Sequence, residues 1–258
     1  MEKVWKNFKK YRFLLGELVK KDIKLKYRRS YLGIFWTLLE PLFTTAVLAF
    51  VFGNLLGRGD KTFPVYILTG RLLYTFFANS TKAAMKSIRS NSAMIKKVYV
   101  PKYIYPFSSI LSNYVIFLIS LIILFLATFV FKIKPSFYMF QAVIPLVLAL
   151  ILSMGAGMIL ATMAVFFRDL EYLWSVALMI IMYTSAIFYD VAELGLGTNS
   201  WIFKLNPLYM IIVNFRNAIF GRPLDQEALL ISIVYSVGSL FIGSLLFYKK
   251  QDKFILNI

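Results

Sequence analysis

The sequence of 258 residues contains neither cysteine nor histidine. Their absence excludes disulfide bonds, thiolate nucleophiles, the usual zinc sites and every mechanism that uses imidazole as a base. Acidic residues are also few, with 12 Asp and Glu in the chain, and no phosphate-binding or dinucleotide-binding glycine motif occurs. We therefore do not expect an enzyme, and we predict no catalytic residue, no metal site and no cofactor bound by the chain itself.

Apolar and basic residues are present in excess. Hydrophobic residues make up 60% of the chain and the mean hydropathy is +0.72, whereas soluble domains are usually about 45–50% apolar. The 29 Lys and Arg residues are compatible with nucleic-acid binding or with cytoplasmic loops of a membrane protein. They cluster at the N-terminus, in one internal segment and at the C-terminus, each beside a long apolar run. We therefore expect a membrane protein that binds no nucleic acid.

The apolar runs predict an all-α membrane protein with six transmembrane helices. A bilayer-spanning helix needs roughly twenty predominantly apolar residues. The expected spans are residues 33–56, 63–80, 107–131, 139–166, 172–189 and 228–248. The third, fourth and sixth spans contain no charged residue, which argues against an ion-coupled pump, because such pumps usually place acids at mid-membrane.

Residues 1–32 precede the first span and are strongly basic. Five apolar residues recur among them at helical spacing: Tyr11, Leu14, Leu15, Leu18 and Leu25. This spacing predicts an N-terminal amphipathic helix in the membrane interface, with its basic face toward anionic headgroups. A solvated basic tail is the alternative. The segment is far longer than the basic region of a signal peptide, so the first span is expected to be retained.

Residues 190–227 are the least regular part of the chain. They are too polar at both ends to span a membrane, yet they contain moderately apolar pieces at 201–205 and 208–220, separated by Pro207. Irregular backbone at membrane depth is tolerated only where protein or a water-filled cavity covers it. We therefore predict short re-entrant or interfacial helices before the last span.

The distribution of Lys and Arg predicts the orientation of the chain. With the N-terminus inside, 21 basic residues lie on the cytoplasmic side and 7 on the opposite side. Cytoplasmic loops carry the excess of Lys and Arg. We therefore expect a multi-pass protein of the inner (plasma) membrane with both termini in the cytoplasm.

Two charged residues, Glu40 and Arg71, fall within the first two expected spans. Charged side chains inside a membrane are costly unless they are paired or face a cavity. Because the two helices are consecutive and antiparallel, we predict a structural ion pair. Contact with an anionic substrate is the alternative role.

The segment 82–106 carries six basic residues and no acid. Apolar residues are interleaved with the basic ones, which favours an amphipathic segment that docks on a cytoplasmic partner. A solvated loop that merely follows the orientation rule is the alternative.

Aromatic residues are frequent in spans one, two and five. Those that we consider as lining of a conduit are Phe35, Trp36, Phe43, Tyr74, Tyr183, Phe188 and Tyr189. Trp and Tyr collect at membrane interfaces and Phe is a normal lipid-facing residue, so most aromatic residues need no further explanation. Aromatic rings also stack on sugars, and position alone does not separate the two roles.

Four motifs, in order along the chain, resemble ABC-exporter permeases of the polysaccharide and polyol-phosphate class. They are RRSYLGIFW at 28–36 followed by Glu40 and Pro41, NSAMIKKVYVP at 91–101, FFRDL at 166–170, and NPL at 206–208 with Arg216. The residues at 99 and 100 depart slightly from the aromatic that usually precedes the proline, which bears only on details of docking.

The resemblance implies a homodimer that works with two separate ATPase subunits, which would carry the ATP and Mg. It implies that residues 1–32 form a cytoplasmic gate or connecting helix and that residues 33–258 form the six-helix transmembrane domain. It also implies an ATPase-coupling segment, for which the residues here are Asn91, Met94, Ile95, Lys96, Lys97, Val98 and Pro101.

The substrate implied by the resemblance is an undecaprenyl-diphosphate-linked glycan such as O antigen, or teichoic acid in a cell with one membrane. A diphosphate headgroup would be favoured by a basic entrance, which Arg28 and Arg29 supply. The alternatives are a permease for small lipids or drugs, an intramembrane enzyme and a scaffold protein.

Overall fold

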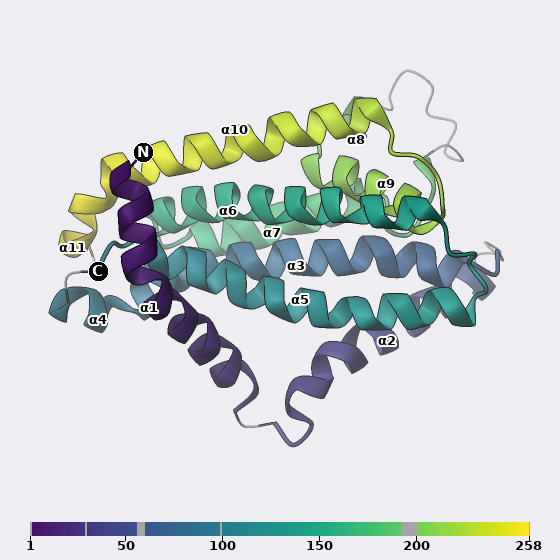
Figure 1. Ribbon diagram of the computed structural model, residues 1–258, viewed down its shortest axis with the longest axis horizontal. Helices are drawn as coiled ribbons and strands as arrows, with labels where there is room; N and C mark the ends of the chain where they lie inside the picture. The colour runs from purple at the N-terminus through teal and green to yellow at the C-terminus, as the bar shows by residue number, and fades with distance from the viewer. Residues whose placement is uncertain (1, 29, 56–59, 99, 192–200, 258) are drawn as a thin grey trace.

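The computed structural model describes residues 2–28, 30–55, 60–98, 100–191 and 201–257, which form a helical bundle without any strand (Figure 1). The longer helices are α1 (Glu2–Tyr27), α2 (Trp36–Ala49), α3 (Phe63–Ser90), α5 (Ile104–Val130), α6 (Val143–Phe166), α7 (Leu170–Thr184), α9 (Pro207–Ile219) and α10 (Gln226–Lys250). The short helices are α4 (Ser92–Lys97), α8 (Trp201–Lys204) and α11 (Phe254–Asn257). Further helical turns are η1 (Gly33–Phe35), η2 (Phe50–Leu55), η3 (Phe137–Ala142) and η6 (Gln251–Lys253). The expected all-α class is confirmed.

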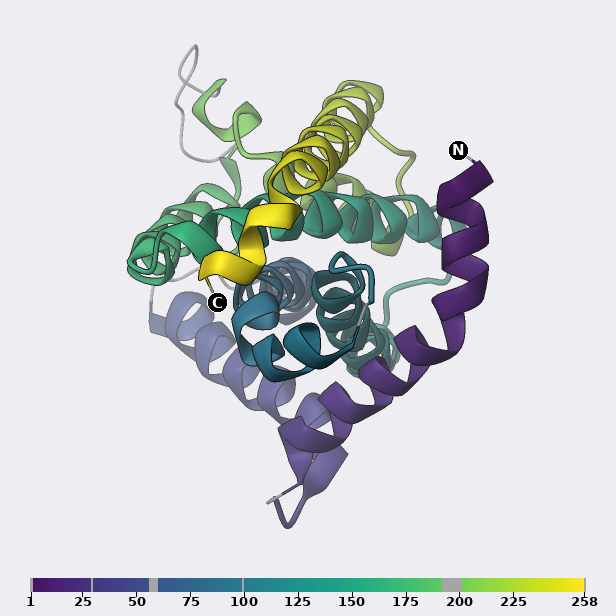
Figure 2. The ribbon, with the colours of Figure 1, turned by 90° about the vertical axis from the view of Figure 1, so that its left-hand side faces the viewer.

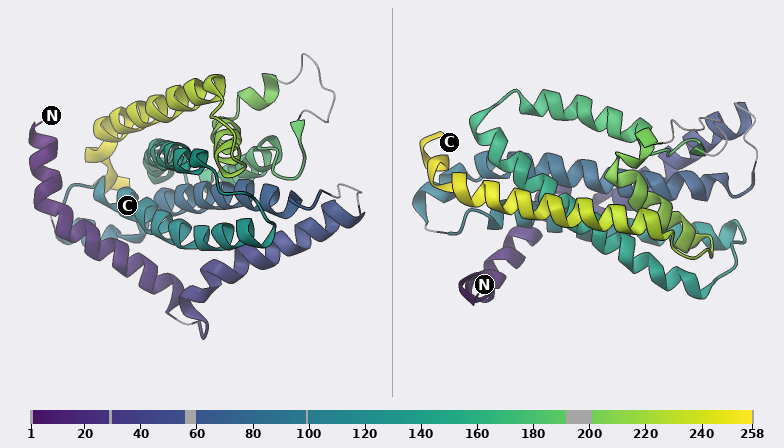
Figure 3. Two further views of the ribbon diagram at one scale, coloured as in Figure 1. Left: turned by 45° about the vertical axis from the view of Figure 1, so that its right-hand side comes forward. Right: turned by 90° about the horizontal axis from the view of Figure 1, so that it is seen from above.

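Helices α3, α5, α6 and α10 run side by side along the long axis of the molecule (Figure 1). One end of the molecule carries α4, α11 and both chain termini, and Figure 2 views the molecule from that end. Helix α1 passes along one side of the bundle there. In the right-hand view of Figure 3, α7 lies at the opposite edge from α1. Helix α3 occupies the centre, since its buried residues extend from Val65 to Ile88.

Four helical stretches of the described residues are long and apolar enough to cross a membrane. They are Gly33–Gly53, Ile104–Val130, Phe137–Phe166 and Gln226–Ile255. They overlap the first, third, fourth and sixth expected spans, so four of the six expected spans coincide with helices long and apolar enough to cross a membrane. The expected end of the first span at residue 56 lies outside the described residues.

The second and fifth expected spans correspond to α3 and α7. With 28 residues, α3 is about 42 Å long, and it continues past the expected end of the span at residue 80 to Ser90. Arg71 and the basic residues of its last turns lower its hydropathy, but its sides are covered by neighbouring helices rather than lipid. Helix α7 is apolar but has only 15 residues. That these two helices span the membrane remains a prediction.

The backbones of α6 and α10 approach closely because small residues lie between them. A Cβ atom on Gly155 would collide with the α10 backbone at Ser239, and one on Gly243 would collide with the Gly155 carbonyl oxygen. The Ser236 hydroxyl donates to the Leu148 carbonyl oxygen at 3.2 Å. Small residues and hydroxyl hydrogen bonds are the usual means by which helices associate in lipid.

Two short helices, α8 and α9, precede α10 where the sequence predicts short helical pieces. Helix α9 begins with Pro207 after the cap residue Asn206, whose side chain accepts a hydrogen bond from the Leu208 N–H at 3.0 Å. Leu208, Ile211 and Phe215 are buried against the bundle. The helices lie at the end of the bundle remote from α4 (Figure 1). Their re-entrant position relative to a membrane remains a prediction, and residues 192–200 lie outside the described part of the chain.

Candidate functional site

The predicted coupling segment forms the short helix α4 at the end that carries both termini. Helix α3 ends at Ser90, and α4 begins after Asn91, whose side-chain amide donates to the Ser87 carbonyl oxygen at 2.8 Å. The chain becomes extended at Val98. Met94, Lys96, Lys97 and Val98 are exposed, Asn91 and Pro101 are half-buried, and Ile95 is buried. The segment therefore projects as a compact, basic surface.

Ile95 differs from its neighbours because it anchors α4 to the bundle. It is 8% exposed and belongs to one core cluster with Ile88, Ile104 and Met158. Ile95 is one of the predicted coupling residues, and the structure buries its side chain beneath α4. Two large apolar side chains remain exposed on this surface beside the basic pair: Met94, at 37%, and Val98, at 53%.

Helix α1 is attached to the start of α4 and to α5. The Lys21 ammonium donates to the Asn91 amide oxygen at 3.1 Å, and the Ser109 hydroxyl donates to the Asp22 carboxylate at 3.4 Å. Leu18 is buried in the same cluster as Ile95. Burial raises the pKa of the Asp22 carboxyl, whereas Lys21 and the hydrogen bond from Ser109 act in the opposite direction. Leu25, which the helical spacing predicts on the apolar face, is exposed.

A partly open polar cavity of about 50 Å³ lies between α1, α2, α3 and α5. Figure 1 shows α1 and α2 converging below α3 and α5. The polar residues that line the cavity are Lys26 and Tyr27 of α1, Thr37, Glu40 and Thr44 of α2, Arg71, Thr75 and Asn79 of α3, and Asn113 and Ser120 of α5. The Lys26 ammonium donates to the Asn113 amide oxygen at 3.5 Å. The cavity thus collects polar residues from segments far apart in the sequence.

Pro41 shapes the wall of this cavity. A proline inside a helix has no N–H to donate to the carbonyl four residues earlier, here that of Thr37 in α2. The Ser120 hydroxyl of α5 lies 2.9 Å from the Thr37 carbonyl oxygen and 3.0 Å from the Ile116 carbonyl oxygen, so the two acceptors share its one proton. This contact ties the gap in the hydrogen-bond ladder of α2 to α5.

Glu40 and Arg71 face the same cavity, but they do not form an ion pair within 4.0 Å among the described residues. The Arg71 guanidinium lies 3.8 Å from the Met182 sulfur and 6.0 Å from the Tyr74 ring centroid. Pairing in another state of the protein remains a prediction. Sequence reasoning missed Lys26, the third charge at this cavity, because it placed α1 wholly in the interface.

The predicted conduit aromatics fall into two groups. Phe35, Trp36 and Phe43 are exposed on η1 and α2, and Tyr183 is exposed on α7. The other three make contacts within the chain: the Tyr74 hydroxyl donates to the Leu178 carbonyl oxygen, Phe188 is buried and stacks on Phe52, and the Tyr189 hydroxyl donates to the Tyr183 carbonyl oxygen. Of the second group, Phe188 is buried, whereas Tyr74 and Tyr189 are half-buried. The assignment remains a prediction.

Of the two residues of the predicted basic entrance, Arg28 and Arg29, the structure describes Arg28. Arg28 is exposed directly after α1, and Arg29 lies outside the described residues. The structure therefore leaves their role as a prediction.

The opposite end of the bundle is held together by Arg216 of α9. Arg216 is 6% exposed, and its guanidinium donates to the carbonyl oxygens of Tyr66, Ala186 and Ile187. It also lies over the Tyr66 ring, 3.5 Å from the centroid. The sequence placed Arg216 in one of the expected short helices, and the structure shows that its side chain joins α9 to α3 and to the turn after α7.

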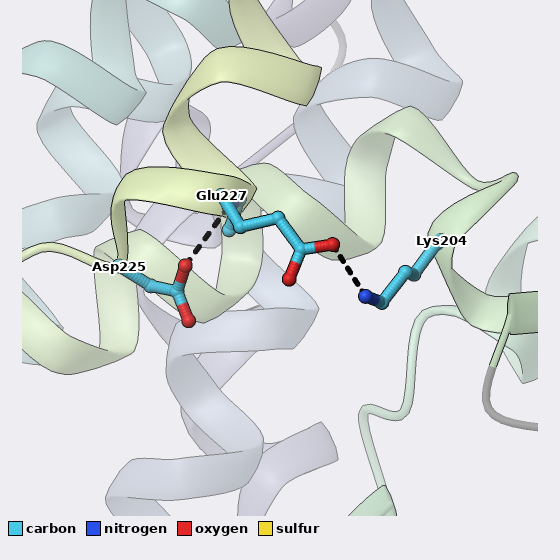
Figure 4. Close-up of polar contacts among 4 residues, drawn as sticks. Lys204, Asp225 and Glu227 are labelled. Carbon is cyan, nitrogen blue, oxygen red and sulfur yellow. Dashed lines mark hydrogen bonds and ion pairs between the residues drawn. The ribbon is translucent and has the colours of Figure 1, made fainter. Parts of the chain in front are cut away.

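Surface contacts at the same end secure the start of α10. The Asp225 side chain caps α10 by accepting a hydrogen bond from the Ala228 N–H at 3.0 Å, and Lys204 of α8 forms an ion pair with Glu227 (Figure 4). The Asn214 side chain also donates to the Asp225 carbonyl oxygen at 3.2 Å. The contacts of Lys204 with Glu227 and of Asn214 with Asp225 attach α8 and α9 to the start of α10.

A bundle with several membrane-length helices and its basic residues concentrated at one end is a polytopic helical membrane protein. Residues 14–220 match the ABC-2 type transporter family, and the chain belongs to that family.

Curated relatives cover almost the whole chain. An O-antigen export system permease protein RfbA of Klebsiella pneumoniae is 29% identical over 245 residues, which is 93% of each chain. The protein of the same name from Myxococcus xanthus is 25% identical over 96% of each chain. The polysialic acid transport protein KpsM of Escherichia coli is 23% identical over 92% of this chain and 93% of its own length.

Proposed function

We propose that this chain is the membrane subunit of an ABC exporter that moves undecaprenyl-diphosphate-linked polysaccharide of the O-antigen type across the inner membrane. The observation that carries the proposal is the end-to-end similarity to O-antigen export permeases. Identity to the polysialic acid transport protein is lower, at 23%, which favours O antigen over capsule. The teichoic-acid and small-lipid or drug alternatives find no comparable support in these relatives.

The energy for transport would come from two separate ATPase subunits that carry ATP and Mg. Helix α4 is the proposed docking element, supported by its exposed Met94 and Val98 and its basic pair Lys96 and Lys97. Its connection to α1 through Lys21 and Asn91 would let a movement of the ATPase reach the amphipathic helix.

The end that carries α4 and both termini is proposed to be cytoplasmic. Supporting this orientation, Lys82, Lys86, Arg89, Lys249 and Lys250 all belong to helix ends on that side. Helices α3 and α7 would then complete six spans, and α8 and α9 would dip into the membrane from the far side.

The functional unit is proposed to be a homodimer formed by the outer faces of α2 and α7. Both helices expose large apolar side chains along their length, including Phe43 and Val47 of α2 and Ile180 and Tyr183 of α7. The η2 turn that continues α2 meets the turn after α7 where Phe52 stacks on Phe188. Pairing two copies here would put the exposed aromatic side chains at the dimer seam, where a glycan could slide along them.

The test is reconstitution of the chain with the ATPase encoded beside it. We expect the two proteins to purify together and ATP hydrolysis to rise on addition of undecaprenyl-diphosphate-linked glycan, but not on addition of a lipid-linked teichoic-acid precursor. Stimulation by small lipids or drugs with no response to the glycan would overturn the assigned substrate. Failure of the proteins to purify together would overturn the assigned partner.

A further inference from the structure

The polar cavity between α1, α2, α3 and α5 contains a cation, Arg71, that forms no ion pair among the described residues. The Arg71 guanidinium is half-buried and has no carboxylate within 4.0 Å in the part of the chain that the structure describes. A guanidinium carries five N–H donors, and the Met182 sulfur at 3.8 Å is a weak acceptor. Inside a membrane helix such a group is costly unless a partner or a ligand satisfies it.

A second cation, Lys26, lies at the mouth of the same cavity. Its side chain is exposed overall, and its ammonium donates to the Asn113 amide oxygen at 3.5 Å. Burial of the ammonium lowers the pKa of Lys26, while the charge of Glu40 opposes that shift. Lys26, Arg71 and Glu40 leave one positive charge in excess, so the cavity is suited to a single anionic group.

The residues that line the cavity indicate which class of anion it can bind. Arg binds phosphate oxygens with two parallel hydrogen bonds, and Lys binds them as a point charge. Phe76 and Phe117 supply apolar surface beside the charges, and α2 and α5 both belong to membrane-length stretches. A phosphate attached to a lipid chain satisfies both parts of this lining, whereas a soluble phosphate satisfies only the charges.

We propose that this cavity binds the phosphate of a lipid, with Arg71 and Lys26 holding the phosphate oxygens and Glu40 as a negative charge in the same lining. Because the Glu40 carboxylate repels the phosphate, it weakens binding and allows release. The lipid is either the carrier of the exported glycan, which rests on the proposed function, or a phospholipid of the bilayer.

The test is native mass spectrometry of the full chain in phosphate-free detergent, titrated with undecaprenyl phosphate, phosphatidylglycerol, or undecaprenol as the chain without phosphate. We expect Arg71→Gln to weaken binding of the preferred phospholipid or prenyl phosphate about tenfold or more, since hydrogen bonds to charged groups are the strong ones. Lys26→Gln should weaken it less, and Glu40→Gln should strengthen it. Arg71→Lys should restore part of the loss.

Lys24→Gln is the matched control, because Lys24 is exposed on α1 and does not line the cavity. If Arg71→Gln does not fold, Lys26→Gln at the mouth carries the test. Equal binding by all variants, or equal binding of undecaprenol and undecaprenyl phosphate, would overturn the site. Tighter binding of undecaprenyl phosphate than of phosphatidylglycerol assigns the site to the carrier, and the reverse assigns it to the bilayer.

This result is separable from the proposed function. Loss of the phosphate site with intact stimulation of ATP hydrolysis by the lipid-linked glycan would refute the site alone. Phosphate binding that depends on Arg71, together with no stimulation by the glycan, would refute the exported substrate alone.

Discussion

Helix α4 allows a test in which adjacent substitutions have different expected effects. Ile95 is buried under the helix, whereas Met94 and Val98 are exposed. Replacing a buried Ile by Ala lowers stability by about 2–5 kcal/mol. Exposed substitutions usually change stability by about 0.5 kcal/mol or less. We therefore expect Ile95→Ala to lower the unfolding temperature of the purified chain and Met94→Ala with Val98→Ala to leave it nearly unchanged.

For binding of the ATPase we expect the opposite order, because the exposed Met94 and Val98 can be buried by the partner and Ile95 is already buried. Complete burial of a Met or Val side chain is worth about 1.5–3 kcal/mol. Met94 is 37% and Val98 53% exposed, so roughly a third to a half of that amount remains to be gained on binding. The double variant should then lose about 1–3 kcal/mol of binding free energy, or roughly 5-fold to 150-fold in affinity for the ATPase.

The assay combines thermal unfolding of the chain with a binding titration against the purified ATPase. Met163→Ala is a useful control, because Met163 is 43% exposed on α6 outside α4. Unchanged affinity of the Met94 and Val98 double variant would refute docking through α4. An Ile95→Ala variant as stable as the wild type would refute the anchoring role.

Three further predictions concern the packing of the bundle, all measured by unfolding in detergent. Ser120→Ala leaves the Thr37 carbonyl oxygen without this donor and should lower the free energy of unfolding by about 1–3 kcal/mol. Retention of full stability would mean that the Thr37 carbonyl oxygen does not need a donor from α5. Gly155→Val should separate α6 and α10 at a cost of about 1–3 kcal/mol, whereas Gly238→Ala, which faces open space, should not destabilise; equal effects would contradict the close approach. Burial raises the pKa of Asp22 above 3.8, so the folded chain holds this proton more readily than the unfolded chain and loses stability as the pH rises through that raised value. Asp22→Asn should therefore raise the unfolding temperature at neutral pH and lose this advantage below about pH 4; an advantage that persists in acid would contradict the assignment.

The membrane-length helices could be predicted because each corresponds to a continuous run of mostly apolar residues. The first, third, fourth and sixth spans follow directly from such runs. Helix α3 was less predictable past residue 80, because Lys82, Lys86 and Arg89 are compatible with a helix and with a loop alike. Only the neighbours that cover α3 decide between the two, and sequence periodicity does not identify those neighbours.

The cavity and the buried contacts could not be predicted for a related reason. Pro41 signals a break in α2, but nothing near it in the sequence indicates that Ser120 supplies the missing donor. Lys26 and Asn113 are 87 positions apart. Nothing near Arg216 in the sequence indicates that it is buried. Its burial depends on carbonyl groups of the turn after α7, which accept its hydrogen bonds only in the folded state. Contacts of this kind depend on tertiary geometry.

The length of α3 has a consequence for how such a protein can change under selection. One end of the helix leads into α4, and the other reaches Tyr66, whose carbonyl oxygen accepts a hydrogen bond from Arg216. The helix separates these two regions by about 40 Å. Substitutions that suit α4 to a different ATPase would leave the far end untouched, and changes there would leave α4 intact. A gene duplicate could therefore change its α4 surface and the far end of the bundle in separate, independent steps.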